Sequence, residues 1–150
     1  MIIREAQLPD LPGILKLYSQ LHKDDPKISD GRSNVIFEQI LESDNLMLFI
    51  GVLQNLIVST CYLNLIPNLT RGGSAYGVIE NVVTDSRHRN EGYGKMMIKH
   101  ALSMAWDRGC YKVMLQAGSR NPATHQFYQS CGFLADEKFA FIARPKESGL

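Results

Sequence analysis

Residues 77 to 106 contain three segments in close succession that restrict the fold more than any other part of the chain. An apolar run, GVIENVV, leads into a turn, HRNEGYGK, which carries two glycines, and then into an amphipathic run, KMMIKHALSMAW. The first run is typical of a buried strand, and the last is typical of a helix with one apolar face. A strand, a glycine turn and a helix in this order are the units from which α/β folds are built.

The turn combines several features that favour binding of an anion. Gly92 and Gly94 lack side chains, so backbone N–H groups can approach a ligand closely. The helix that begins there adds the positive end of its dipole. Arg87, Arg89 and Lys95 flank these donors with cationic side chains. The turn therefore predicts a site for an anion with several oxygens, such as a pyrophosphate. The alternative is an ordinary strand-to-helix turn with solvated arginines.

Two well-known phosphate-binding motifs do not fit this turn. A Walker A motif needs a glycine where Arg89 stands and a serine or threonine where Met96 stands. The dinucleotide-binding fingerprint needs a third glycine where Met97 stands. The ligand is therefore expected to be a phosphorylated molecule of another class.

Composition excludes several kinds of protein. The chain has 150 residues, of which 45% are hydrophobic and 21% charged, and this is typical of one globular domain. The net charge of +1 argues against nucleic acid or an anionic membrane as a partner. The longest apolar stretch, Leu46 to Leu53, is too short to span a bilayer. The three cysteines and four histidines lack metal-site spacing, so we expect no metal. The absence of a spanning stretch and the odd number of cysteines favour a cytoplasmic protein.

The other segments alternate between strand-like and helix-like patterns. Strands are predicted at 1–5, at 46–66 with a hairpin turn near 54–55, at 75–84, at 111–117 and at 139–144, and helices at 9–21, 35–43, 92–108 and 122–130. This order predicts an α/β fold. If the strands on either side of the third helix are parallel, that helix forms a right-handed crossover.

Two motifs, RNEGYG at 89–94 and NPATHQFYQSCGF at 121–133, together resemble the GNAT superfamily of acyl-CoA N-acyltransferases. In that family an R/Q-x-x-G-x-G/A loop binds the pyrophosphate of coenzyme A. The stretches IENVV, DSR, GCYKV and FYQSCGF are most similar to glucosamine-6-phosphate N-acetyltransferases. The resemblance implies one GNAT domain over residues 1–150, with a mixed central sheet of six to seven strands and helices on both faces. It also implies that the fourth and fifth strands splay to admit acetyl-CoA.

The resemblance assigns cofactor contacts to particular residues. The backbone of Val82, Val83 and Thr84 would contact pantetheine and the thioester oxygen, and Asn121 would contact pantetheine. The pyrophosphate would contact the residues of the glycine turn, namely Arg89, Asn90, Glu91, Gly92, Tyr93, Gly94 and Lys95.

The resemblance also gives Tyr128 a catalytic role. It would hold the sulfur of coenzyme A and protonate the leaving thiolate, because the pKa of a phenol, about 10, lies above that of a thiol. The alternative is an aromatic side chain that simply packs beside Phe127 and Phe133.

Glu80 and Asn81 interrupt an otherwise apolar strand. A carboxylate inside a covered sheet is unfavourable unless it is paired or faces a wet cleft. Glu80 is therefore the candidate general base for the acceptor ammonium, and a structural ion pair or an exposed strand end is the alternative. Relatives often carry an acidic residue where Gln116 stands, and the glucosamine phosphate enzymes often carry one where Asn81 stands. The second difference weakens the expectation of an aminosugar substrate.

Together these features predict a cytoplasmic N-acetyltransferase that moves an acetyl group from acetyl-CoA directly to a primary amine of a small metabolite. An aminosugar phosphate is one candidate, and the loops at 22–34 and 66–74 would bound the acceptor site. The alternatives are a protein lysine or N-terminal acetyltransferase and a non-catalytic acyl-CoA binding module. Members of the family are often dimers, so a homodimer is compatible with the resemblance.

Overall fold

The computed structural model describes residues 1–21, 25–26, 28–118, 121–138 and 140–145. The chain divides into two compact units, Met1–Leu115 and Gln116–Leu150.

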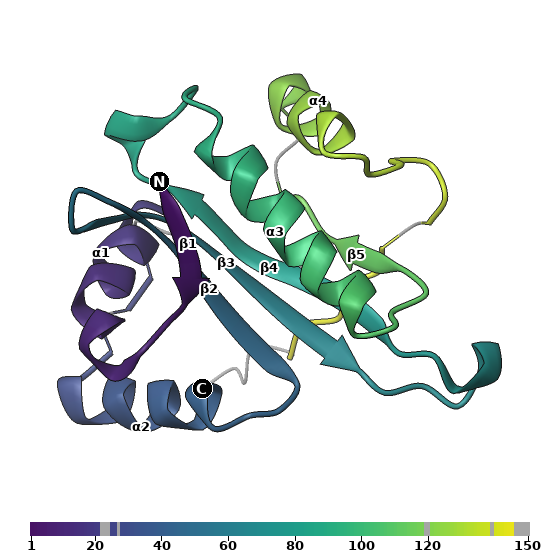
Figure 1. Ribbon diagram of the computed structural model, residues 1–150, viewed down its shortest axis with the longest axis horizontal. Coiled ribbons are helices and arrows are strands. Elements are labelled where there is room, and N and C mark those ends of the chain that lie inside the picture. The colour runs from purple at the N-terminus through teal and green to yellow at the C-terminus, as the bar shows by residue number, and fades with distance from the viewer. Residues whose placement is uncertain (22–24, 27, 119–120, 139, 146–150) are drawn as a thin grey trace. The chain divides into compact units, whose positions relative to one another are not determined.

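The first unit is built on one mixed sheet of five strands (Figure 1). The strands lie side by side in chain order: β1 (Ile2–Glu5), β2 (Leu46–Leu53), β3 (Leu56–Ile66), β4 (Tyr76–Thr84) and β5 (Val113–Leu115). The pairs β1–β2, β2–β3 and β3–β4 are antiparallel, whereas β4 and β5 are parallel. The mixed α/β architecture is confirmed, but the expected six to seven strands are wrong for the described residues, where the sheet has five.

Helices cover both faces of this sheet: α1 (Leu11–Leu21), α2 (Asp30–Leu41) and α3 (Tyr93–Asp107). Successive residues of a strand point to opposite faces, and β2 shows which helices lie where. Leu48 and Ile50 pack in one core cluster with residues of α1 and α2. Phe49 points the other way and meets His100 of α3, with ring centroids 4.7 Å apart. Helices α1 and α2 therefore share one face of the sheet, and α3 covers the other (Figure 1).

The hairpin between β2 and β3 confirms the predicted break. Gln54 and Asn55 both have positive φ, 47° and 64°, and two left-handed residues between antiparallel strands give the tight turn that matches the twist of a sheet. Three short 3-10 turns complete the unit: η1 (Leu8–Asp10), η2 (Arg71–Gly73) and η3 (Ser86–His88).

Several predicted boundaries need correction. The strand expected at 111–117 is limited to Val113–Leu115, and the helix expected from Val35 begins at Asp30. The 139–144 segment was predicted as a strand, but residues 140–145 form none, and Phe139 lies outside the described residues. Phe141 and Ile142 are exposed there. An apolar run forms a strand only when a neighbouring strand hydrogen-bonds to its backbone N–H and C=O groups. No strand among the described residues pairs with this segment.

The second unit contains the helix α4 (Pro122–Ser130), whose bounds match the prediction. Asn121 caps it, because its side-chain oxygen accepts a hydrogen bond of 3.0 Å from the Ala123 N–H. Proline at the first helical position fits the same pattern, since its missing N–H would have no partner there. Gly132, with φ of 102°, follows the C-terminus of the helix.

Candidate active site

Strand β4 contains a bulge at the two residues that interrupt its apolar pattern. Opposite β3, Thr60 pairs with Val83 and Tyr62 pairs with Glu80, so β4 holds one residue more than β3 across this step. Asn81 adopts a left-handed conformation with φ of 51°. Such a bulge leaves backbone groups outside the ladder of hydrogen bonds.

Strand pairing on the other side of β4 stops before this stretch. Strand β5 pairs with Gly77, Val78 and Ile79 of β4. Beyond Ile79, no strand among the described residues pairs with β4 on its β5 side. The backbone between Glu80 and Thr84, where the acyl-CoA contacts of Val82, Val83 and Thr84 were predicted, is the edge at which a ligand can replace a strand.

Glu80 is exposed in the middle of β4. Residues directly opposite each other in an antiparallel pair lie on the same face, so Glu80 shares with Tyr62 the face that α1 and α2 cover. Glu80 forms no ion pair with any described residue. The structural ion pair considered as an alternative is therefore not seen in this part of the chain, and the role of general base stays a prediction.

Beyond β4, the chain is held by a buried aspartate. Asp85 is only 4% exposed and accepts hydrogen bonds from the Arg87 backbone N–H (3.0 Å) and guanidinium (3.1 Å). These bonds from Arg87 hold the pKa of the Asp85 carboxyl well below its usual range. Gln20 of α1 donates to Asp85 (3.4 Å) and accepts from the Ser86 N–H (2.9 Å). The start of the glycine turn is thus fastened to α1.

This anchor was missed by the sequence reasoning, which treated Arg87 as a free cation of the anion site. Its guanidinium is instead paired with Asp85. An aspartate directly before a Ser-Arg pair is a common cap of a tight turn, because its carboxylate accepts from the N–H two residues on. That local pattern could have identified Asp85.

The glycine turn ends at the N-terminus of α3, as predicted. Asn90 and Gly92 both have positive φ, 63° and 83°. The first helical hydrogen bond runs from the Met96 N–H to the Gly92 carbonyl (3.0 Å). The N–H groups of the three residues in between have no partner inside the helix, and they stand where the helix dipole favours an anion. Arg89 lies against the turn, since its Nε donates to the Thr84 carbonyl (3.2 Å).

In the second unit, the structure gives Asn121 and Tyr128 local contacts. Asn121 caps α4 as described above, and Tyr128 is half-buried on the same helix. The Tyr128 ring meets Phe127 and Phe133 edge to face, with centroids 5.0 Å and 6.2 Å away. The packing that was considered as an alternative is therefore present. These ring contacts do not test the role of the hydroxyl, so the proposed contact of Tyr128 with sulfur stays a prediction.

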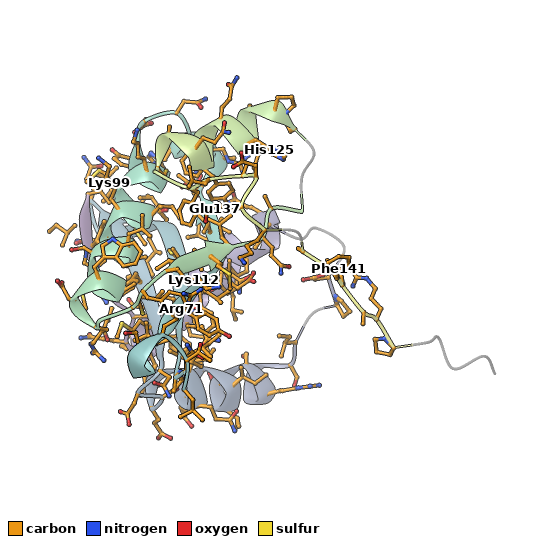
Figure 2. All side chains as sticks on the ribbon, turned by 90° about the vertical axis from the view of Figure 1, so that its right-hand side faces the viewer. Arg71, Lys99, Lys112, His125, Glu137 and Phe141 are labelled. Carbon is orange, nitrogen blue, oxygen red and sulfur yellow. The ribbon has the colours of Figure 1, made fainter. Side chains whose placement is uncertain are left out.

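The 66–74 loop was expected to bound the acceptor site with Arg71. In the structure this guanidinium lies over the Tyr111 ring, 5.9 Å from its centroid. The Lys112 ammonium lies over the same ring and over Tyr76, at 5.5 Å and 5.2 Å. Figure 2 shows Arg71 and Lys112 close together. Part of the other expected loop, residues 22–24 and 27, lies outside the described residues.

Among the described residues, no group of three or more His, Cys, Asp or Glu side chains is gathered as a metal site would require. Within the same residues, no helix has both the length and the apolar character needed to cross a bilayer.

Comparisons with known proteins identify relatives along most of the chain. Glucosamine 6-phosphate N-acetyltransferase 1 of Oryza sativa subsp. japonica is 30% identical over 137 residues, covering 88% of this chain and 80% of that protein. Glucosamine 6-phosphate N-acetyltransferase of Trypanosoma brucei brucei is 39% identical over 82 residues, covering 55% of this chain. That alignment spans about half the length of the trypanosome protein, 54%.

Solved structures share the fold. A putative acetyltransferase from Agrobacterium tumefaciens str. C58 is 39% identical, with a TM-score of 0.92 over 97% of this chain and 100% of that one. Glucosamine-6-phosphate N-acetyltransferase from Arabidopsis thaliana is 25% identical, with a TM-score of 0.81 over 99% of this chain and 98% of that one. Residues 11–133 match the model of the acetyltransferase (GNAT) family. The chain belongs to the acetyltransferase (GNAT) family.

Proposed function

We propose that the protein is an N-acetyltransferase that moves an acetyl group from acetyl-CoA directly to a primary amine of a small metabolite. Membership of the family supports the reaction type. The observation that carries the proposal is the bulge of β4. The bulge interrupts the pairing of β4 with β3 next to Glu80, just beyond the last residue of β4 that pairs with β5, on the strand that leads into the glycine turn.

In this proposal acetyl-CoA binds along the uncovered part of β4. Its pyrophosphate accepts hydrogen bonds from the N–H groups of the 89–95 turn and is balanced by Arg89 and Lys95. Pantetheine pairs with the backbone of residues 82–84 in place of a strand, where β5 has ended. Asn121 adds a contact with pantetheine. The fourth and fifth strands, β4 and β5, would part at this point.

The reaction needs one base, one acid and one oxyanion donor. The acceptor ammonium loses a proton to Glu80, directly or through water, and the neutral nitrogen attacks the thioester carbon, forming a C–N bond. The oxyanion of the tetrahedral intermediate accepts a hydrogen bond from an N–H of β4. The C–S bond then breaks, the thiolate takes a proton from the Tyr128 hydroxyl, and the nitrogen loses its second proton to solvent. Solvent also takes the proton from Glu80 and returns one to Tyr128, so the products are the amide, free coenzyme A and one proton.

Two other functions remain as outcomes of the test. A protein acetyltransferase would act on lysine or an N-terminus, and a binding module would hold acyl-CoA without turnover. A pocket of about 130 Å³ on the α1 and α2 face of β4 has room for part of a small acceptor, and this favours a small amine over a protein substrate, which needs an extended groove. The names of the relatives make an aminosugar phosphate one substrate to include.

The experiment is a screen for release of coenzyme A from acetyl-CoA with aminosugar phosphates, polyamines, amino acids, arylalkylamines and peptides. Release that depends on a small amine, with the acetylated amine found by mass spectrometry, would support the proposal. Release only with peptides would favour a protein acetyltransferase. Binding of acetyl-CoA with no release in any mixture would favour the binding module.

The role of Glu80 is tested by Glu80→Gln, with Glu5→Gln on the distant edge strand β1 as the control. Above the pKa of the acceptor amine no base is needed, so the variant should lose more turnover at neutral than at alkaline pH. Glu5→Gln should behave as the wild type. An unchanged pH-rate profile in Glu80→Gln would reject the assignment.

A further inference from the structure

A pocket of about 130 Å³ lies in the first unit, on the sheet face that α1 and α2 cover. Its walls come mainly from apolar side chains of the two helices, including Ile14 and Leu15 of α1 and Ile36 and Phe37 of α2. None of the described residues that line it carries a charge. A charged group placed against these walls would lose its hydration without gaining a partner.

The size of the pocket limits what can fill it. A cavity of about 150 Å³ with aliphatic and aromatic walls stays dry and binds benzene. The present pocket is slightly smaller, so it fits one phenyl ring or a branched alkyl group. A hexosamine phosphate is larger and carries a dianion, which proteins normally bind with cationic side chains.

Apart from Ser33 of α2, the polar side chains of the pocket lie where it reaches β4. Asn81, the left-handed residue of the bulge, lines the pocket together with Tyr18 of α1 and Tyr62 of β3. The Tyr18 hydroxyl interacts with the Asn81 side chain. Tyr62 is the residue directly opposite Glu80. The pocket is therefore mainly apolar between the helices and more polar next to the candidate base.

We propose that the acceptor amine carries an apolar group about the size of a phenyl ring, and that this pocket binds it. This inference rests on the proposed acetylation of small amines and names the class of acceptor. With the apolar group between α1 and α2, the amine nitrogen lies at the polar end, near Asn81 and Glu80. Primary arylalkylamines and branched alkylamines are the simplest members of this class.

Binding is tested first without turnover, by NMR of isoleucine methyl groups titrated with phenethylamine. Ile14, Ile36 and Ile40 line the pocket, whereas Ile79 and Ile98 are buried elsewhere in the first unit. The methyl signals of the first three should shift in a saturable way, and those of the other two should not. Shifts spread over all five, or none at saturating amine, would overturn the assignment of the pocket.

Turnover is tested with two tryptophan variants of neighbouring residues on α2. Ile36 is 37% exposed and lines the pocket, whereas Val35 is 54% exposed and does not. Ile36→Trp should fill the pocket and raise KM for phenethylamine about tenfold or more, as expected when the burial of one apolar group is lost. Val35→Trp should leave KM unchanged, and both variants should bind coenzyme A as the wild type does.

Leu15 of α1 also lines the pocket and is 38% exposed. If Ile36→Trp fails to fold, Leu15→Trp repeats the test. Acetylation of glucosamine 6-phosphate but of no apolar amine would overturn this inference and leave the proposed function standing. If phenethylamine shifts the methyl signals of the pocket isoleucines but no amine is acetylated, the pocket assignment stands and the proposed function is overturned.

Discussion

The glycines at the two ends of α3 allow a matched test of the anion site. Gly92 precedes the helix with φ of 83°, and Gly109 follows it with φ of 72°. A Cβ added to either would meet no atom within 4 Å. Gly92→Ala and Gly109→Ala therefore cost only the strain of a left-handed alanine, about 1 kcal/mol each. For a domain of this size that lowers Tm by about 2–4 °C, and the two variants should match.

Binding of coenzyme A should separate the two variants. In the proposed complex, the methyl group added at Gly92 takes up space next to the N–H groups that would bind the pyrophosphate, at the start of α3. We expect Kd for coenzyme A to rise about tenfold, or about 1.4 kcal/mol, in Gly92→Ala and not to change in Gly109→Ala. Calorimetric titration measures both values, and thermal unfolding measures the shared loss of stability. Equal destabilisation with wild-type affinity in both variants would refute the placement of the pyrophosphate.

Three further predictions concern other residues. Hydrogen bonds from Arg87 lower the folded-state pKa of the Asp85 carboxyl. The ionised carboxylate therefore stabilises the fold above its ordinary pKa of 3.8, and this contribution to the free energy of unfolding is lost as the pH falls below that value. Asp85→Asn should therefore cost about 1–3 kcal/mol at neutral pH, and its difference from wild type in urea unfolding should shrink below that pH; a constant difference would contradict this. Burial raises the pKa of the Cys61 thiol to about 12, so a thiol reagent at pH 8 should label Cys61 only after unfolding, and rapid native labelling would disprove its burial. Tyr128→Phe keeps the ring contact with Phe133 and removes the proposed acid, so turnover should fall about 10²-fold; unchanged turnover would reject the role of Tyr128 as the acid.

The parts of the fold that could be predicted are those whose signals are local. Gln54 and Asn55 can adopt the left-handed turn of a hairpin, and Pro122 after Asn121 marks a helix start through capping. The start of α3 also follows from a local signal, because Gly92 can adopt the positive φ that its N-cap position has. Each of these features depends on a few adjacent residues, so sequence alone was sufficient.

The parts that could not be predicted depend on partners far away in the chain. The run at 139–144 has strand composition, but a strand needs a neighbour and the described part of it has none. The length of β5 is set by where its pairing with β4 stops, at Ile79. Nor does the residue type of Asn81 show that β4 bulges there, because the bulge is defined by the register against Thr60 and Tyr62.

The candidate site shows the same division. The turn at 89–95 and the carboxylate of Glu80 could be proposed from residue types and spacing. The buried anchor formed by Asp85 and Gln20 joins residues 65 positions apart, and the apolar pocket joins α1, α2 and β4. No local pattern reports such contacts, which is why the class of acceptor had to be inferred from the structure.

The central claim is that the backbone N–H groups between Arg89 and Lys95 bind the pyrophosphate of coenzyme A. Amide NMR of the protein titrated in parallel with coenzyme A and with pantetheine, which lacks the pyrophosphate, tests this most directly. We predict that the largest shifts with coenzyme A fall on the amides of residues 90–95 and that pantetheine leaves those amides unchanged. Saturation with coenzyme A while these amides stay in place, or equal shifts with pantetheine, would contradict the account.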